Sequence, residues 1–224
     1  MKSPARNTGR SCKQIVIMKR NNLIVALIFL IFFVISFLSN ILGPLIPDII
    51  DSFDLSIGLA GFLPFSFFVA YGVMSIPSGI LIEKYSEKMV TLVGFALAFF
   101  AALLFALVPK FEVALLSLFA IGIGMAMLQV VINPLLRQAG GEQHFAFNSV
   151  MAQFFFGSAS FLSPLLYSYL VSNIHTADTS PVIELFNGLV TPEIKWVSLY
   201  WVFALTALIM VVIIALVRFP KVEL

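Results

Sequence analysis

Residues 113–136, VALLSLFAIGIGMAMLQVVINPLL, decide the fold of this chain. The stretch contains no charged residue, and roughly 20 apolar residues are enough for a helix to cross the hydrocarbon core of a bilayer. Near its end, Gln129 and Asn133 stand one helical turn apart and share one face of the predicted helix. Polar groups in hydrocarbon are costly unless they pair or line a cavity, so these two amides mark a candidate functional site.

The composition of the whole chain is that of an integral membrane protein. Of its 224 residues, 61% are hydrophobic and 11% are charged, whereas soluble domains contain about 25% charged residues. We expect an N-terminal segment at 1–22 and a tail at 219–224. Between them we expect an all-α bundle of six transmembrane helices, near residues 23–47, 57–82, 89–108, 113–136, 147–171 and 196–218.

The basic residues indicate which ends of the helices face the cytoplasm. With the N-terminus in the cytoplasm, eleven of the 13 Lys and Arg residues fall on that side and two on the other. This is the positive-inside pattern, and it places both termini in the cytoplasm. Topology thus accounts for the positive charge, so we expect lipid and no nucleic acid as a partner. The eleven are Lys2, Arg6, Arg10, Lys13, Lys19, Arg20, Lys84, Lys88, Arg137, Arg218 and Lys221, and the two are Lys110 and Lys195.

Several chemistries have nothing in the predicted spans to support them. No span has a charged side chain near its centre, and His144 and His175 fall in loops. Cys12 is the only cysteine, so there is no disulfide framework and no cysteine-based metal site. We therefore expect neither an enzyme nor a bound metal or cofactor.

Met18 is an alternative start of translation, because enough positive charge follows it to orient the first helix.

Four prolines fall inside the predicted helices, namely Pro44, Pro77, Pro134 and Pro164. Proline has no backbone N–H and frees the carbonyl four residues earlier, so each is expected to bend its helix. The stretches 40–45 and 132–135 both contain Asn followed by Pro, and they would lie at opposite membrane faces. A three-plus-three inverted repeat produces this arrangement, and chance similarity between two proline-containing helices is the alternative.

Three predicted helices carry small and amide residues along one face. The amides are Asn40, Gln129, Asn133 and Gln153. Amides donate and accept hydrogen bonds, as hydroxyl-rich solutes do, and the ring of Tyr71 suits the apolar face of a sugar. We predict that these five residues bind the substrate. The alternative for the amides is that they tie helices together.

The small residues of the same stripes have a different interpretation. Their lack of bulk lets helices approach closely, so we predict a packing role for them. They are Gly43, Gly122, Ala126, Gly157 and Ser160.

The longest predicted loop, residues 172–195, contains the apolar piece VIELFNGLV at 182–190. A short helix lying at the outer membrane interface and a loop without regular structure are equally consistent with this piece.

Between the second and third predicted helices, residues 78–88 read SGILIEKYSEK. This stretch resembles the loop signature of the major facilitator superfamily, a Gly followed by an acid and then basic residues, which clamps neighbouring helices on the cytoplasmic side. Gly79, Glu83, Lys84 and Lys88 match the signature. Ser86 replaces a usual Gly, and Glu83 stands for the commoner Asp.

Three further blocks narrow the resemblance. They are NILGPLIPDIIDSFDLS at 40–56, YGVMSIPSG at 71–79 and LQVVINPLL at 128–136. Together they look like the N-terminal six-helix half of the fucose–proton symporter family of sugar transporters. The resemblance implies a proton-coupled sugar carrier whose central cavity lies between two six-helix bundles.

The resemblance also carries expectations about residues. It implies that Gln129, Asn133, Gln153 and Tyr71 take polar or aromatic cavity positions. Acids that the family uses in helices one and four are replaced by Gly43 and Gln129 in our alignment. Neither of these residues takes up a proton, so the family's substrate and its coupling mechanism do not carry over directly.

The predicted function is transport of a monosaccharide by alternating access, coupled to H⁺ or Na⁺, with this chain as the N-terminal half of the carrier. The chain stops six residues after Arg218, so a truncated or split carrier, a second six-helix half or self-association is expected. Two alternatives remain open. One is a non-transporting scaffold or inactive remnant, and the other is a carrier of a different amphipathic solute such as a peptide or drug.

Overall fold

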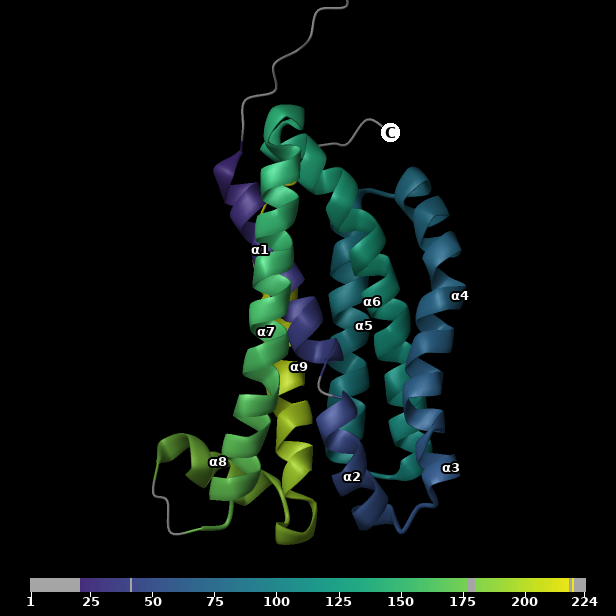
Figure 1. The fold of residues 1–224 in the computed structure, drawn as a ribbon, viewed down its shortest axis with the longest axis vertical. Helices are drawn as coiled ribbons and strands as arrows, with labels where there is room; N and C mark the ends of the chain where they lie inside the picture. Colours follow the sequence, from purple (N-terminus) through teal and green to yellow (C-terminus); the bar gives the residue numbers. More distant parts are fainter. Residues whose placement is uncertain (1–20, 41, 177–179, 218, 220–224) are drawn as a thin grey trace, which may run out of the picture.

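The computed structural model of the chain describes residues 21–40, 42–176, 180–217 and 219. The described residues form a bundle of long helices that run side by side (Figure 1). The α-helices are α1 (Asn22–Ser39), α2 (Leu42–Phe53), α3 (Ile57–Ala60), α4 (Phe62–Lys84), α5 (Glu87–Leu107), α6 (Phe111–Gly140), α7 (Phe145–Asn173), α8 (Pro181–Leu189) and α9 (Ser198–Leu216). Short 3-10 helices at Glu142–His144 and Pro192–Val197 precede α7 and α9.

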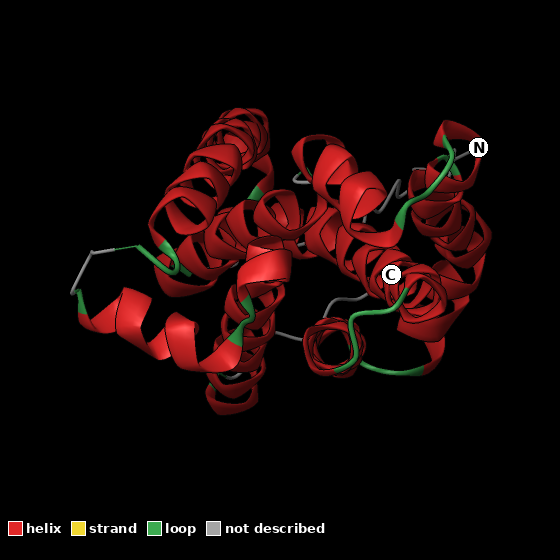
Figure 2. Cartoon of the chain, turned by 90° about the horizontal axis from the view of Figure 1, so that it is seen from below, coloured by secondary structure: helices red, strands yellow, loops and turns green. Residues whose placement is uncertain are grey.

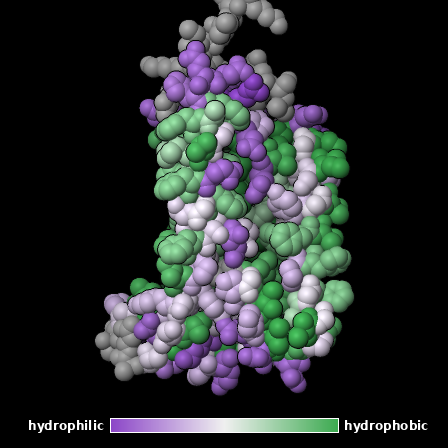
Figure 3. Space-filling model, in the orientation of Figure 1, coloured by the Kyte–Doolittle hydropathy of each residue, from purple (hydrophilic) through white to green (hydrophobic). Residues whose placement is uncertain are grey.

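Six segments of the described chain are long and apolar enough to cross a membrane. They are Asn22–Phe53, Ile57–Lys84, Glu87–Leu107, Phe111–Gly140, Glu142–Asn173 and Pro192–Leu216. The predicted fold class, an all-α protein with six transmembrane helices, is therefore confirmed. Apolar side chains cover the middle of the bundle and hydrophilic ones gather at both of its ends (Figure 3).

The ends of the chain lie largely outside the described residues. This applies to the predicted segment 1–22 up to residue 20, which includes Cys12 and Met18, and to most of the tail at 219–224. Arg218, the predicted end of the last helix, is outside them as well.

The first span differs from the single helix predicted at 23–47. α1 ends at Ser39, and α2 begins at Leu42 and continues to Phe53. Pro44 is the third residue of α2, where backbone N–H groups have no acceptor within the helix and a proline is tolerated. The interruption falls beside Asn40, whose carbonyl Pro44 was predicted to free, but it takes the form of one helix ending and a second one starting rather than of a bend within one helix.

The other three prolines lie inside helices that continue past them. Pro77 is in α4, Pro134 in α6 and Pro164 in α7. α6 extends four residues beyond the predicted end at 136, to Gly140. In the longest predicted loop, the piece at 182–190 forms most of α8, so the helical alternative is the one that the structure adopts.

α6 lies at the centre of the bundle and packs against α4 and α5. A Cβ added at Gly122 would overlap the backbone carbonyl of Phe67 in α4. At Gly124 it would lie 2.6 Å from the carbonyl oxygen of Gly94 in α5. Backbones approach so closely only where side chains are absent, so the predicted packing role of Gly122 is confirmed.

The same prediction fails for two other glycines. An added Cβ at Gly43 in α2 or at Gly157 in α7 would meet no atom within 4 Å among the described residues. Both positions are exposed, because they lie on helix faces that no neighbouring helix of the described chain covers.

The helix pairing follows the order expected for an inverted repeat. α4, in the second span, packs along α6, in the fourth. α7, in the fifth span, packs along α1, in the first. Exchanging the first three spans with the last three converts one pair into the other. The bundle therefore presents two equivalent helix pairs.

Candidate functional site

The predicted polar face of α6 makes a direct contact with α4. The Tyr71 hydroxyl donates a hydrogen bond to Oε1 of Gln129 over 3.0 Å. Both side chains are half-buried. The ring of Tyr71 stacks on Phe67 of its own helix, with centroids 6.4 Å apart and planes 16° apart. The structure thus brings together two of the five predicted site residues.

This contact determines what Gln129 offers to a solute. Its carbonyl oxygen is engaged by Tyr71, whereas its amide nitrogen has no hydrogen bond within the described part of the chain. An amide nitrogen only donates. Gln129 is therefore oriented as a hydrogen-bond donor.

In Asn40, at the end of α1, the amide nitrogen is engaged and not the carbonyl oxygen. Its Nδ2 donates to Oγ of Ser36 over 2.9 Å and to the Ser36 carbonyl oxygen over 3.2 Å. Ser36 in turn donates from Oγ to the carbonyl oxygen of Phe156 in α7, over 2.6 Å. The side chain of Asn40 is exposed and its carbonyl oxygen has no partner in the described residues. Asn40 therefore presents an acceptor.

Asn133 and Gln153 are both exposed, and neither side chain has a hydrogen bond within residues 21–40, 42–176, 180–217 and 219. Asn133 lies one turn beyond Gln129 on α6, and Gln153 lies on α7. Among the described residues, no hydrogen bond joins these two amides to each other or to Tyr71. They remain predicted solute ligands with unused donors and acceptors.

The polar groups interrupt an otherwise apolar surface. The site residues come from the end of α1 and from α4, α6 and α7. In the view of Figure 3, hydrophilic side chains appear at mid-height over α6 and between α6 and α7, inside the apolar band. Such a surface suits a face that is covered by a solute or by water rather than by lipid.

Sequence reasoning missed Ser36 as a site residue. It is fully buried, and its hydroxyl joins Asn40 to the backbone of α7. Its position four residues before Asn40 was the available signal, because the two side chains share one helical face.

The loop signature between α4 and α5 makes specific contacts. Ser86, which replaces the usual glycine, caps α5 by accepting a hydrogen bond from the Met89 N–H over 3.3 Å. Lys88 donates from Nζ to the carbonyl oxygens of Ala215 and Val217, over 2.7 and 2.8 Å. These carbonyls belong to the end of α9, where a cation is favoured by the helix dipole. Lys88 therefore ties the loop to the last span.

The other signature residues have looser surroundings. The ammonium of Lys84 lies 5.6 Å from the centroid of the Tyr85 ring. Glu83 is exposed, and an added Cβ at Gly79 would meet no described atom within 4 Å.

The fold and the site can now be set beside known proteins. The family model of the Major Facilitator Superfamily matches residues 28–223. The chain belongs to this superfamily. The predicted resemblance is thereby confirmed, and the family is one of transporters, not of enzymes.

The relatives within the superfamily are sugar transporters. The chain is 27% identical over 198 residues to the glucose/galactose transporter of Brucella abortus biovar 1 (strain 9-941). The match covers 87% of this chain and 46% of that protein. It is 29% identical over 153 residues to the L-fucose-proton symporter of Escherichia coli (strain K12). This match covers 66% of this chain and 35% of the symporter. The chain thus spans about half or less of the length of these relatives.

A solved structure shows the same architecture. The crystal structure of the superfamily transporter FucP in the outward conformation superposes with a TM-score of 0.69 at 25% identity. The match covers 88% of this chain and 50% of that one. This superfamily member is therefore a multi-pass membrane protein with the fold of one half of that transporter.

Proposed function

We propose that this chain forms one six-helix half of a carrier that moves a monosaccharide across the bacterial inner membrane by alternating access. The observation that carries the proposal is the Tyr71–Gln129 hydrogen bond. It orients a polar amide on an apolar helix, in a superfamily member whose relatives are named as sugar transporters. Both termini would lie in the cytoplasm, as the distribution of Lys and Arg predicts.

The hydrogen-bonding pattern of the site supports a hydroxylated solute. Gln129 offers a donor, Asn40 offers an acceptor, and Asn133 and Gln153 offer both. A sugar hydroxyl donates one hydrogen bond and accepts others, so fixed donors and acceptors on one surface match it. Tyr71 acts first as the residue that positions Gln129, and stacking of its ring on a sugar remains a prediction.

Coupling to H⁺ or Na⁺ is part of the proposal, but its ionisable groups are sought elsewhere. The site residues of this chain are amides and a phenol, and an amide cannot carry a proton at physiological pH. We assign the coupling group to a second six-helix half. This half, or a second copy of the chain, would also close the solute cavity from the opposite side.

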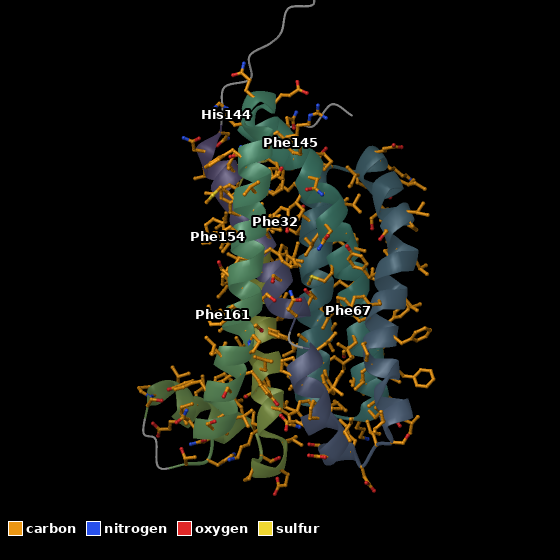
Figure 4. All side chains as sticks on the ribbon, in the orientation of Figure 1. Phe32, Phe67, His144, Phe145, Phe154 and Phe161 are labelled. Atoms are coloured by element: carbon orange, nitrogen blue, oxygen red, sulfur yellow. The ribbon has the colours of Figure 1, made fainter. Side chains whose placement is uncertain are left out.

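The exposed surfaces of two spans support such a partner. In each of the spans Ile57–Lys84 and Glu142–Asn173, only 22% of an apolar 18-residue stretch is buried. In the span Phe111–Gly140 the buried share is 61%. On α7, Phe154 and Phe161 lie along one exposed side of the helix (Figure 4). A partner half would cover the parts of these faces that carry polar site residues, which hydrocarbon disfavours, and lipid would cover the rest.

Uptake measurements test the proposal. The chain would be co-expressed with a second six-helix half in cells or vesicles and supplied with a panel of monosaccharides. Gln129→Ala should lower uptake about tenfold or more, because ~1.4 kcal/mol of lost solute binding is a tenfold change. The matched control is Asn173→Ala, which removes an amide at the end of α7 whose side chain donates to the Tyr169 carbonyl oxygen and is not among the predicted site residues. The control should leave uptake unchanged.

Three results would contradict the proposal. Uptake that survives Gln129→Ala would remove the site. Counterflow of peptides or drugs without counterflow of sugars would indicate a carrier of another solute. No uptake of any solute by a well-folded pair of halves would favour a scaffold. Imposed H⁺ and Na⁺ gradients then identify the coupling ion.

A further inference from the structure

The short helix α8 lies apart from the six spans. It lies beside the lower end of α7 and runs across the bundle axis, while the long helices run along that axis (Figure 1). The view from below shows it from its side at the edge of the molecule, following the grey link after α7 (Figure 2). A helix in this position lies parallel to the plane of a membrane that the bundle crosses.

The side chains of α8 fall on three sides of the helix. Ile183 and Phe186 are buried against the protein. Glu184 is exposed and Asn187 is half-buried, and these two side chains form the polar side. The third side is apolar and also exposed, at 57% for Val182, 62% for Leu185 and 44% for Leu189. These three positions follow the spacing i, i+3 and i+7, which places them on one face of a helix.

Two hydrogen bonds fasten α8 to the end of α7. The His175 backbone N–H donates to Oδ1 of Asn187 over 2.7 Å, and its ring Nε2 donates to the Val190 carbonyl oxygen over 2.6 Å. His175 adopts a φ of +56°, an uncommon conformation for a non-glycine residue. The orientation of α8 relative to the spans is therefore set by specific contacts.

The neighbouring surface of α7 is that of a membrane span near its end. Leu162 and Leu165 are exposed on it, and Tyr169 follows at 47% exposure. Tyr is enriched where a span meets the headgroups, because its ring is apolar and its hydroxyl polar. α8 follows this end of α7 and therefore lies at the membrane depth where a headgroup layer is expected.

We propose that α8 is a lipid-interface helix, in which Val182, Leu185 and Leu189 insert between the headgroups and acyl chains of the adjacent leaflet. The distribution of Lys and Arg makes this the outer leaflet. A helix with one apolar side and one polar side lies in this layer with its apolar face about 5–10 Å below the headgroups. α8 would fix the depth of α7 and α9 in the bilayer, and this role is independent of the transported solute.

Site-specific fluorescence tests the proposal on the full chain. Cys12→Ser removes the only cysteine, and Leu185→Cys then accepts an NBD fluorophore. Glu184→Cys, at the preceding residue on the polar side of α8, is the matched control. Each protein would be reconstituted in phosphatidylcholine vesicles that contain a nitroxide near the headgroup or near the chain end. Val182→Cys and Leu189→Cys repeat the test, so a folding failure of one variant does not decide the result.

The expected result is a blue-shifted emission at residues 182, 185 and 189, with stronger quenching by the shallow nitroxide than by the deep one. The label at residue 184 should instead be quenched by aqueous iodide. Iodide quenching at residue 185 equal to that at residue 184 would place this side in water and overturn the proposal. Protection from both iodide and nitroxides would also overturn it, because a protein surface would then cover α8.

Discussion

Two helix pairs, α4 with α6 and α1 with α7, occupy equivalent places in the bundle but are joined in different ways. Between α4 and α6 the backbones touch, since Gly122 leaves no room for a Cβ beside Phe67. Ser66 adds a hydrogen bond from Oγ to the Leu115 carbonyl oxygen over 2.8 Å. The Tyr71–Gln129 bond then joins two side chains at the same interface.

Between α1 and α7, side chains rather than close backbones make the contact. Phe29 stacks on Phe155 with centroids 5.3 Å apart. Ser36 donates to the Phe156 carbonyl oxygen, and Ser163 donates to the Phe37 carbonyl oxygen over 3.0 Å.

This difference indicates which substitutions each helix pair tolerates. A contact between backbones cannot admit a larger residue, because neither main chain can move without displacing its whole helix. A contact through serines and rings loses only the bonds that a substitution removes. Each pair nevertheless places an amide, Gln129 or Asn40, at its edge, and in each case a hydroxyl orients it.

The largest effect is expected at the backbone contact. Gly122→Val should destabilise the folded chain by about 1–3 kcal/mol or more, because the new side chain overlaps the backbone of α4. The control is Gly157→Val on α7, where the space is open, and its effect should stay within about 0.5 kcal/mol. Unfolding of the purified chain by SDS in mixed micelles measures both. Equal losses would show that the two pairs do not differ in closeness.

A smaller effect is expected at the serine contacts. Ser36→Ala should cost about 1.2 kcal/mol, because hydrogen bonds between membrane helices average near 0.6 kcal/mol and this hydroxyl makes two bonds, one to α7 and one to Asn40 at the end of its own helix. Ser66→Ala removes one such bond from the other pair and should cost less. The same unfolding measurement compares them. A larger loss for Ser66→Ala would reverse this ranking of the pairs.

The smallest effect on stability is expected at Tyr71. Tyr71→Phe removes only the hydroxyl and should cost about 0.6 kcal/mol or less. It should nevertheless raise the KM for the transported solute, since the amide of Gln129 is then free to rotate. Tyr169→Phe, at an exposed position on α7, is the control and should change neither quantity. An unchanged KM for Tyr71→Phe would mean that the hydroxyl does not position Gln129 for the solute.

Much of the fold was predictable because it depends on composition along the chain. Long apolar runs without charged residues identify the spans. A segment with unpaired charges would not insert, because the free energy of placing a charge in hydrocarbon is too unfavourable. The break after Ser39 was not predicted, although Pro44 signalled a disturbance. A proline bends a helix from its interior but is tolerated in a first turn, and the sequence does not say which of the two a helix adopts.

The site was predictable in part, for a similar reason. Gln129 and Asn133 were identified because amides are rare and costly in a span. Tyr71 was recognised as a candidate, but its hydrogen bond to a residue 58 positions away was not. Gly122 and Gly157 had the same interpretation from their stripes, yet one is enclosed by α4 and the other is open.

The sequence by itself determined that this chain crosses a membrane in six helices, which polar residues interrupt them, and which family it resembles. These properties follow from residue type and spacing, because hydrocarbon selects against charge and a helix repeats its faces regularly. Only the tertiary structure decided that Gln129 presents a donor and Asn40 an acceptor, and that Gly122 closes a helix contact while Gly157 stays open. The orientation of an amide and the room beside a glycine depend on neighbours that the chain brings together only by folding.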